Sequence, residues 1–230
     1  MPLIEVVEVS HSYPQTTGRR QVLIDLTVTL SEHRIGVIGA NGSGKSTFAR
    51  LLNGLVLPDS GQVRVDGLDT RRHGSAVRRL VGFCFTDPDA QIVMPTVRED
   101  VMFGLRRRWL PAAEIAARVD RALAEFGLAD HAYHPAHLLS GGQKQLLALA
   151  SVLVTEPELL VMDEPTTLLD LRNAAAVGEI VAWLPHQVIL LTHHLDLLTG
   201  FDRVLVFDEG RLVCDDMPER ASAFYRKLMG

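Results

Sequence analysis

The residues best suited to chemistry form a glycine-rich segment, Gly39-Ala40-Asn41-Gly42-Ser43-Gly44-Lys45-Ser46-Thr47. It fits the pattern G-x-x-x-x-G-K-[ST] and stands between an apolar run and a helical pattern. Glycines let backbone N–H groups turn toward an anion, and the helix N-terminus adds a partial positive charge. Lys45 can reach the outer phosphates of a nucleotide, and the Ser46 hydroxyl can ligate Mg²⁺. The flanks favour a nucleotide site over a glycine-rich turn before an ordinary helix.

Two carboxylates follow a second apolar run, Leu159–Met162. They are Asp163 and Glu164, and in open parallel sheets ligands bind at the carboxyl ends of strands. Asp163 can hold Mg²⁺ there, usually through water, and Glu164 can polarise an attacking water as a general base. The pair alone is equally compatible with a strand that ends in polar residues. Beside the glycine-rich segment, it supports nucleotide binding.

A second helix start suited to an anion precedes the apolar helical pattern Lys144–Val154. It has the sequence Leu139-Ser140-Gly141-Gly142-Gln143. Ser140 is a favourable N-cap, and the two glycines leave backbone N–H groups open. Taken alone, this is a capped helix with a flexible start. The sequence therefore contains two helix N-termini that could face a phosphate.

These groups need a framework of strands and helices. Residues 1–30 are rich in Val, Ile and Thr and alternate in polarity, which predicts antiparallel strands. Short apolar runs predict strands of a parallel sheet that is covered on both faces: Ile35–Ile38, Leu159–Met162, Val188–Leu191 and Val204–Phe207. Helical patterns fall between them: Lys45–Asn53, Pro111–Phe126, Lys144–Val154 and Leu171–Leu184. This alternation predicts an α/β fold in one domain, residues 1–230, with an inserted helical subdomain at about 87–145.

Composition and charge exclude several classes of protein. The 230 residues carry 23 Lys and Arg against 28 Asp and Glu, a net charge of −5, so no nucleic-acid partner is expected. Cys84 and Cys214 form neither a disulfide framework nor a metal-ligand spacing. The longest uncharged apolar stretch near the middle, Gln145–Thr155, is shorter than the roughly 20 residues that cross a bilayer. We expect a chain that is soluble by itself, without a secretory signal, and able to bind a membrane protein.

With these motifs in order, nearly the whole chain resembles the ATP-binding-cassette (ABC) ATPases. Residues 139–143 are identical to that family's LSGGQ signature and are called the signature segment below. Asp163-Glu164-Pro165-Thr166 matches the family's D-E-P-T. The resemblance gives further residues a role: Leu169-Asp170 as the dimer-contact loop, His193 as the switch histidine, and Tyr13 as the aromatic that stacks on adenine. It implies a P-loop (RecA-like) fold with an antiparallel β-subdomain and a helical subdomain.

The resemblance also implies a mechanism. Family members dimerise head to tail, so the signature segment of one chain closes over ATP and Mg²⁺ held by the other. Glu164, His193 and Lys45 would be catalytic, and Ser140 and Gly142 would grip the γ-phosphate in trans with Gly141 and Gln143 beside them. Such a chain would be an ATPase that acts as a homodimer or beside a paired ABC ATPase.

One segment points to a subgroup. Phe85-Thr86-Asp87-Pro88-Asp89-Ala90-Gln91-Ile92-Val93 resembles the F-Q-N-P-D-x-Q-I-V segment of energy-coupling-factor (ECF) transporter ATPases, which drive vitamin, cobalt or nickel uptake. Residues 31–36 and 169–173 look like the biotin-uptake branch. The resemblance implies a peripheral protein on the cytoplasmic face of the membrane. Its partners would be a membrane coupling (T) subunit and a substrate-binding (S) subunit.

The sequence departs from the family pattern at Thr86, where relatives carry a glutamine that contacts Mg²⁺ and the attacking water. Thr86 has no amide, so its role as a metal contact is doubtful, and we expect weaker Mg²⁺ binding or looser coupling. Gln91 is not an obvious replacement, since relatives also have a glutamine there. His194 stands where many members have Asp, and it fits a solvated helix start equally well.

Other features favour ordinary structural roles. His131, His134 and His137 invite a metal site, but Pro135 and the loop-like setting favour a polar turn. Residues 106–108, three arginines, fit a solvated helix end better than a contact with acidic lipids. A non-transport cassette protein would usually need a second cassette or a long coiled coil, and a nucleotide kinase offers no account of the signature segment.

Overall fold

The structure is a computed structural model that describes residues 1–16, 18–106 and 108–230. Arg107, the middle residue of the arginine run, lies outside the described residues. The chain divides into two units. The first consists of Met1–Val81, Glu158–Asp163 and Pro185–Gly230, and the second of Gly82–Pro157 and Glu164–Leu184.

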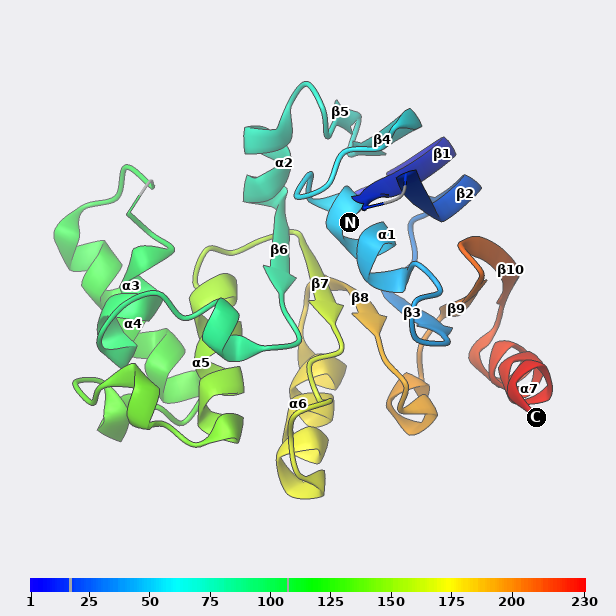
Figure 1. Ribbon diagram of the computed structural model, residues 1–230. Helices are drawn as coiled ribbons and strands as arrows, with labels where there is room; N and C mark the ends of the chain where they lie inside the picture. Colours follow the sequence, from blue (N-terminus) through cyan, green and yellow to red (C-terminus); the bar gives the residue numbers. More distant parts are fainter. Residues whose placement is uncertain (17, 107) are drawn as a thin grey trace. The chain divides into compact units, whose positions relative to one another are not determined.

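The first unit contains an antiparallel sheet of strand order β2-β1-β4-β5 (Figure 1). Its strands are β1 (Ile4–Gln15), β2 (Gly18–Leu30), β4 (Ser60–Val65) and β5 (Leu68–Asp69). Strand β1 pairs with both β2 and β4, and the register shifts along both pairings. The alternation in residues 1–30 thus forms a sheet with one buried face, and the expected antiparallel strands are confirmed.

A second, mostly parallel sheet places five strands in this unit, in the order β10-β9-β3-β8-β7. They are β3 (Arg34–Gly39), β7 (Leu159–Asp163), β8 (Gln187–Leu191), β9 (Arg203–Asp208) and β10 (Arg211–Asp216). Strand β3 runs parallel to β8 and β9, β8 runs parallel to β7, and β10 is antiparallel to β9. Every residue of β3, β7 and β8 is buried, as their continuous apolar runs predict.

The first unit also contains the helices α1 (Lys45–Leu52), α2 (Gly74–Leu80) and α7 (Pro218–Met229) and the 3₁₀ turn Leu195–Leu198. The α1 helix packs on the parallel sheet through Phe48, whose ring centroid lies 5.2 Å from that of Phe207 on β9. Because β3, β7 and β8 are parallel, their carboxyl ends meet at one edge of the sheet. Gly39, Asp163 and Leu191 are the residues that end there.

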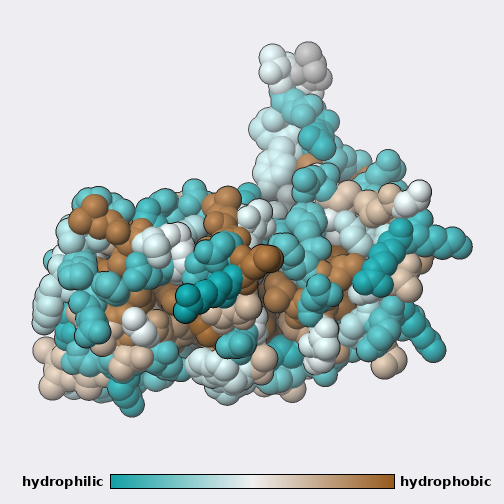
Figure 2. Space-filling view, turned by 90° about the horizontal axis from the view of Figure 1, so that it is seen from below, coloured by the Kyte–Doolittle hydropathy of each residue, from teal (hydrophilic) through white to brown (hydrophobic). Residues whose placement is uncertain are grey.

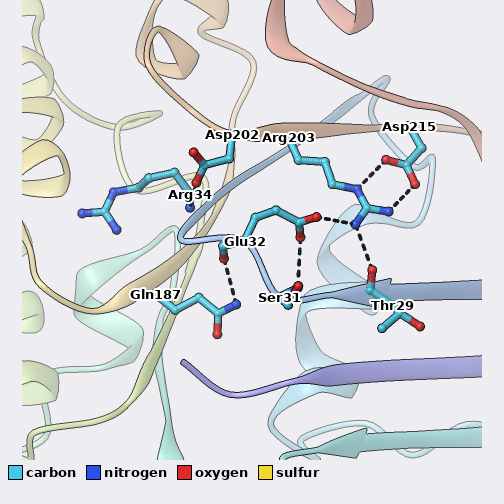
Figure 3. Close-up of polar contacts among 8 residues, drawn as sticks. All are labelled: Thr29, Ser31, Glu32, Arg34, Gln187, Asp202, Arg203 and Asp215. Atoms are coloured by element: carbon cyan, nitrogen blue, oxygen red, sulfur yellow. Dashed lines mark hydrogen bonds and ion pairs between the residues drawn. The ribbon is translucent and has the colours of Figure 1, made fainter.

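The opposite, amino edge of this sheet is held by ion pairs and hydrogen bonds. Arg203 at the start of β9 donates two hydrogen bonds to Asp215, at 2.6 Å each, one to Glu32 at 2.9 Å and one to the Thr29 carbonyl at 2.9 Å (Figure 3). These hydrogen bonds, to Asp215 above all, raise the pKa of Arg203 against the effect of burial. Gln187 at the start of β8 donates to the Glu32 carbonyl at 2.8 Å. We call Glu32, Gln187, Arg203 and Asp215 the amino-edge network.

The second unit is mainly helical. The β6 strand (Val81–Cys84) begins at the last residue of the first unit and continues into the second unit. Its helices are α3 (Val97–Phe103), α4 (Ala112–Glu125), α5 (Gly141–Leu153) and α6 (Leu171–Trp183), with the 3₁₀ turns Pro88–Ala90, Ala129–His131 and Ala136–Leu138. Buried Asp100 on α3 accepts hydrogen bonds from the Val93 and Met94 N–H groups and from Ser151 on α5. This carboxylate ties the loop before α3 to the helix that follows the signature segment.

Large apolar side chains are exposed on the second unit: Val93, Phe103, Trp109, Leu171 and Trp183. On the face shown in Figure 2, hydrophobic residues form patches separated by hydrophilic ones. Among the described residues, no helix is both long enough and apolar enough to span a bilayer.

Candidate nucleotide site

The glycine-rich segment forms a loop that joins β3 to α1, and we call residues 39–47 the phosphate loop. Gly44 is the N-cap of α1 and has a positive φ of 103°. A Cβ at Gly44 would lie 2.6 Å from the Val22 carbonyl oxygen, so no other residue fits without displacing β2. The first backbone N–H groups of α1 therefore point into the loop, where an anion is favourable.

Lys45 bends back over this loop. Its Nζ donates to the Gly39 carbonyl at 2.6 Å and to the Ala40 carbonyl at 3.0 Å, and the residue is only 5% exposed. The ammonium group thus stays inside the curve of the loop. There it can exchange the two carbonyl acceptors for phosphate oxygens. Buried Ser43 Oγ has no hydrogen-bond partner among the described residues, which is an arrangement that an incoming phosphate can relieve.

The outer side of the loop lines a cavity of about 420 Å³. Asn41 and Gly42 border it together with Arg20 on β2 and the turn between β9 and β10 at Glu209. The predicted binding residues of the loop therefore divide between its inner curve and this outer cavity.

Ser46 and Asp163 meet at the carboxyl edge of the sheet. The Ser46 hydroxyl donates to Asp163 Oδ1 at 2.8 Å, and Arg50 Nη2 lies 3.9 Å from Asp163 Oδ2. Asp163 is 1% exposed. A hydroxyl and a carboxylate side by side next to a phosphate loop form the oxygen donor set that Mg²⁺ prefers, with phosphate and water completing the shell. The residues fit a magnesium ion.

Tyr13 lies on β1, beside the end of the phosphate loop. Its hydroxyl is 3.4 Å from Thr47 Oγ1. The His11 ring packs edge-on against it, with centroids 4.7 Å apart and an interplanar angle of 83°. The Tyr13 ring is half-buried, so one part is held and another is available for stacking on a base.

His193 follows β8 and is exposed. The preceding residue, buried Thr192, donates its N–H to the Val37 carbonyl of β3 at 3.2 Å and accepts a hydrogen bond from His194 N–H at 3.0 Å. These bonds fix the turn at the carboxyl edge that also holds Gly39 and Asp163. His194 thereby has a local structural role in the turn.

Glu164 is the first residue of the second unit after the boundary at Asp163. It is 8% exposed, and its φ of 54° is unusual for a residue other than glycine. Thr167 Oγ1 donates to Glu164 Oε2 at 3.1 Å. A carboxylate held in a strained backbone position and oriented by a hydroxyl is suited to act as a general base.

Ser140 caps α5 in a reciprocal arrangement. Gln143 N–H donates to Ser140 Oγ at 3.3 Å, and Ser140 N–H donates to Gln143 Oε1 at 2.9 Å. The N-cap expected at Ser140 is therefore present, with Gln143 as its partner. A Cβ on buried Gly142 would lie 2.4 Å from Asn173 Oδ1 of α6, so a larger residue there would have to displace the Asn173 side chain. The contact with Asn173 could not be predicted from the sequence.

Asp170 caps α6 and accepts from Asn173 N–H at 2.8 Å. Both polar atoms of the Gln91 side-chain amide bind backbone groups. The oxygen accepts from Phe85 N–H at 3.1 Å, and the nitrogen donates to the Ala148 carbonyl at 3.0 Å. These contacts hold the segment around Thr86, which is half-buried. Gln91 is thus a structural residue in this unit.

A phosphate loop on a helix N-terminus, a buried lysine and a serine–aspartate pair at the carboxyl edge of a parallel sheet define a P-loop nucleoside triphosphatase. The sequence matches the family model described as ABC transporter over residues 23–167. The chain belongs to the ABC transporter family, as one of its ATP-hydrolysing subunits.

Named relatives are similar over most of the chain. A biotin transport ATP-binding protein, BioM, of Rhizobium etli is 52% identical over 92% of this chain and 94% of that protein. The energy-coupling factor transporter ATP-binding protein EcfA of Methanosarcina acetivorans is 42% identical over 94% of this chain and 80% of that protein. The solved structure of cbiO1 from Clostridium perfringens, part of the ABC transporter complex cbiONQ, has a TM-score of 0.82 and 33% identity, covering 98% of this chain and 92% of that one. The α/β fold with an antiparallel sheet and a mostly parallel sheet is confirmed.

Proposed function

We propose that the chain is the ATP-hydrolysing subunit of an ECF importer, that it works as a head-to-tail dimer, and that its cargo is a vitamin, most specifically biotin. The observation that carries the proposal is the presence of two helix N-termini suited to phosphate, one at Lys45 and one at Ser140, in separate units. One such terminus suffices to hold a triphosphate. The second is accounted for if it binds the nucleotide of another copy.

In this mechanism the phosphate loop and Lys45 hold the β- and γ-phosphates. Ser46 and Asp163 would hold Mg²⁺, which would supply positive charge beside the phosphate oxygens. Glu164 accepts a proton from the attacking water, and His193 contacts the γ-phosphate from the turn after β8. Ser140 and Gly142 of the second chain close the site. Loss of the γ-phosphate then removes the anion that both chains grip, and the dimer opens.

The names of the relatives support an ECF assignment, and two of those proteins are named for energy coupling or for biotin transport. The exposed apolar side chains of the second unit, including Val93, Phe103 and Trp109, suit a membrane coupling (T) subunit that would keep the chain on the cytoplasmic face. An S subunit would then bind the cargo. Cobalt, nickel or another vitamin is the alternative cargo.

The experiment that tests the ATPase mechanism replaces Glu164 by Gln. The purified Glu164→Gln chain is expected to retain ATP and Mg²⁺ and to elute as a dimer, with hydrolysis reduced by at least about 100-fold because the general base is lost. Glu179→Gln on the exposed face of α6 makes the same charge change and is the control, with unchanged turnover. A Glu164→Gln chain that stays monomeric with ATP and hydrolyses it normally contradicts the proposal.

The cargo is tested separately. The chain is purified with its bound partners from membranes of its own cell, and uptake of labelled biotin is compared with uptake of labelled cobalt in cells that carry Lys45→Met. Loss of biotin uptake alone supports biotin. Loss of cobalt uptake with biotin uptake intact contradicts it and supports the alternative.

A further inference from the structure

A chain of hydrogen bonds connects half-buried His131 and exposed His134 to the signature segment within the second unit. His134 Nδ1 lies 2.9 Å from His131 Nδ1, and His131 Nε2 lies 2.9 Å from Gln143 Nε2. Gln143 Oε1 in turn accepts from Ser140 N–H at 2.9 Å. His134, His131, Gln143 and Ser140 thus form one hydrogen-bonded line, which ends at the N-cap of α5.

The donors and acceptors in this line are fixed by elimination. A backbone N–H can only donate, so the Gln143 atom that faces Ser140 must be the amide oxygen. The amide nitrogen therefore faces His131, and it can only donate, so His131 Nε2 must be an unprotonated acceptor. Neutral His131 then carries its proton on Nδ1 and donates it to His134 Nδ1. His134 carries its own proton on Nε2.

We propose that His131 is a positioning residue for the signature segment, with His134 as its support. The proposal rests on the function proposed above, in which Ser140 contacts the γ-phosphate held by a second chain. His131 anchors the Gln143 amide, and Gln143 holds Ser140 at both its N–H and its Oγ. Because Ser140 Oγ accepts the Gln143 N–H, its own hydroxyl proton remains to be donated to a phosphate oxygen. His131 thereby orients Ser140 without touching the nucleotide.

The closing experiment uses the full chain with Glu164→Gln, in which the ATP concentration that gives half-maximal dimerisation is measured by light scattering. Adding His131→Ala is expected to raise that concentration by about three- to tenfold, the range of one lost hydrogen bond. His131→Gln supplies an amide oxygen as acceptor and is expected to restore most of the loss. His137→Ala, an exposed histidine of the same loop outside the hydrogen-bonded line, is the matched control and is expected to have no effect.

The outcomes separate the two proposals. If the Glu164→Gln parent fails to dimerise with ATP, the proposed function fails and the role of His131 fails with it. If the parent dimerises and His131→Ala needs the same ATP concentration, only the role of His131 is overturned. In the chain with Glu164 intact, His131→Ala is expected to raise KM for ATP while kcat changes by less than about twofold, since the removed bond positions a binding group. A fall of kcat by about three- to tenfold with an unchanged KM contradicts this role.

Nuclear magnetic resonance of the unsubstituted chain with ¹⁵N-labelled histidine tests the hydrogen-bonded line directly, because it reports the tautomer of each histidine. This measurement tests the role of His131 even if the His131→Ala chain does not fold. The account expects His131 in the Nδ1–H tautomer and His134 in the Nε2–H tautomer at a pH where both are neutral. The Nε2–H tautomer at His131 would leave two donors facing each other at Gln143 and would overturn the proposal.

Discussion

The two edges of the parallel sheet in the first unit use charged groups in different ways. At the amino edge, Arg203 is saturated by Asp215, Glu32 and a backbone carbonyl (Figure 3). At the carboxyl edge, Lys45 donates to carbonyls of its own loop and Ser46 donates to Asp163. In the amino-edge network the charged groups of Arg203, Asp215 and Glu32 pair with one another. The carboxyl edge holds groups whose bonds an anion and a cation can replace.

The comparison teaches where stability and binding reside. Opposite charges that satisfy each other stabilise the fold but have little capacity left for a ligand. A lysine held by neutral carbonyls gains a stronger, charge-assisted partner when phosphate arrives. Substitutions at the amino edge should therefore lower the free energy of unfolding, and substitutions at the carboxyl edge should weaken nucleotide binding.

The largest effect is expected at the carboxyl edge. Lys45→Met removes the charge that reaches the outer phosphates, so the Kd for ATP with Mg²⁺, measured by isothermal titration calorimetry, should rise about 10- to 100-fold. The loss of the two bonds to the Gly39 and Ala40 carbonyls should lower the free energy of unfolding without nucleotide by about 1 kcal/mol. An unchanged Kd for ATP would contradict the assignment of nucleotide binding to the carboxyl edge.

Arg203→Met is the matched substitution at the amino edge. It leaves Asp215 and Glu32 without their shared partner, and the free energy of unfolding, measured with urea, should fall by about 1–3 kcal/mol. The Kd for ATP should stay within about twofold of the original because the strand ends that hold the phosphate loop lie at the other edge. A loss of ATP affinity equal to that of Lys45→Met would show that the edges are not separate.

A pH effect of intermediate size is expected from Glu32. Burial by itself would raise the pKa of Glu32, but hydrogen bonds from the backbone N–H groups of Ser31 and Glu32 and from Arg203 outweigh it and lower the pKa below 4.5. The charged form therefore stabilises the fold above that ordinary value, and the contribution is lost as the pH falls through the folded-state pKa.

The measurement is urea unfolding from pH 7 to pH 3 for the unsubstituted chain and for Glu32→Gln. The stability difference between the two should shrink as the pH falls below about 4.5, and it should disappear below the lowered folded-state pKa, where both chains are uncharged at this position. A difference that stays constant over the whole range would contradict the role assigned to Glu32.

The smallest effect is expected at Thr86. Thr86→Gln supplies the amide that the family resemblance predicts at this position, and the Mg²⁺ concentration for half-maximal hydrolysis should fall by about two- to fivefold, the range of one weak added contact. Gln91→Ala is not a suitable control, since it would remove the two backbone contacts that hold the segment. An unchanged Mg²⁺ dependence counts against a metal contact at this position.

Much of the sheet could be predicted because its strands have local signals. The continuous apolar runs in β3, β7, β8 and β9 predict strands covered on both faces, and all four are present. Strand β10 has no such apolar run, because its exposed residues alternate with half-buried ones, and its pairing with β9 supplies the order. The short helix α3 was missed as well, although its capping box at Thr96 and Glu99 is a signal that the sequence carries.

The candidate site shows the same division. Motif spacing identifies the phosphate loop, Asp163 and Ser140, since each stands at the end of an element with a recognisable pattern. The roles of these residues stay predictions. Contacts between residues distant in sequence, such as His131 with Gln143 or Gly142 with Asn173, depend on how loops and helices pack, and no local pattern records them.

The central claim is that one chain supplies the phosphate loop and another supplies the signature segment around the same ATP. The most direct measurement mixes two chains in the Glu164→Gln background, one with Lys45→Met and one with Ser140→Arg, and counts the ATP trapped in dimers. Each chain alone should trap none, whereas mixed dimers should trap one ATP each, since they contain one intact loop facing one intact signature segment. A mixture that traps no more ATP than either chain alone, while the parent traps it, would contradict the account.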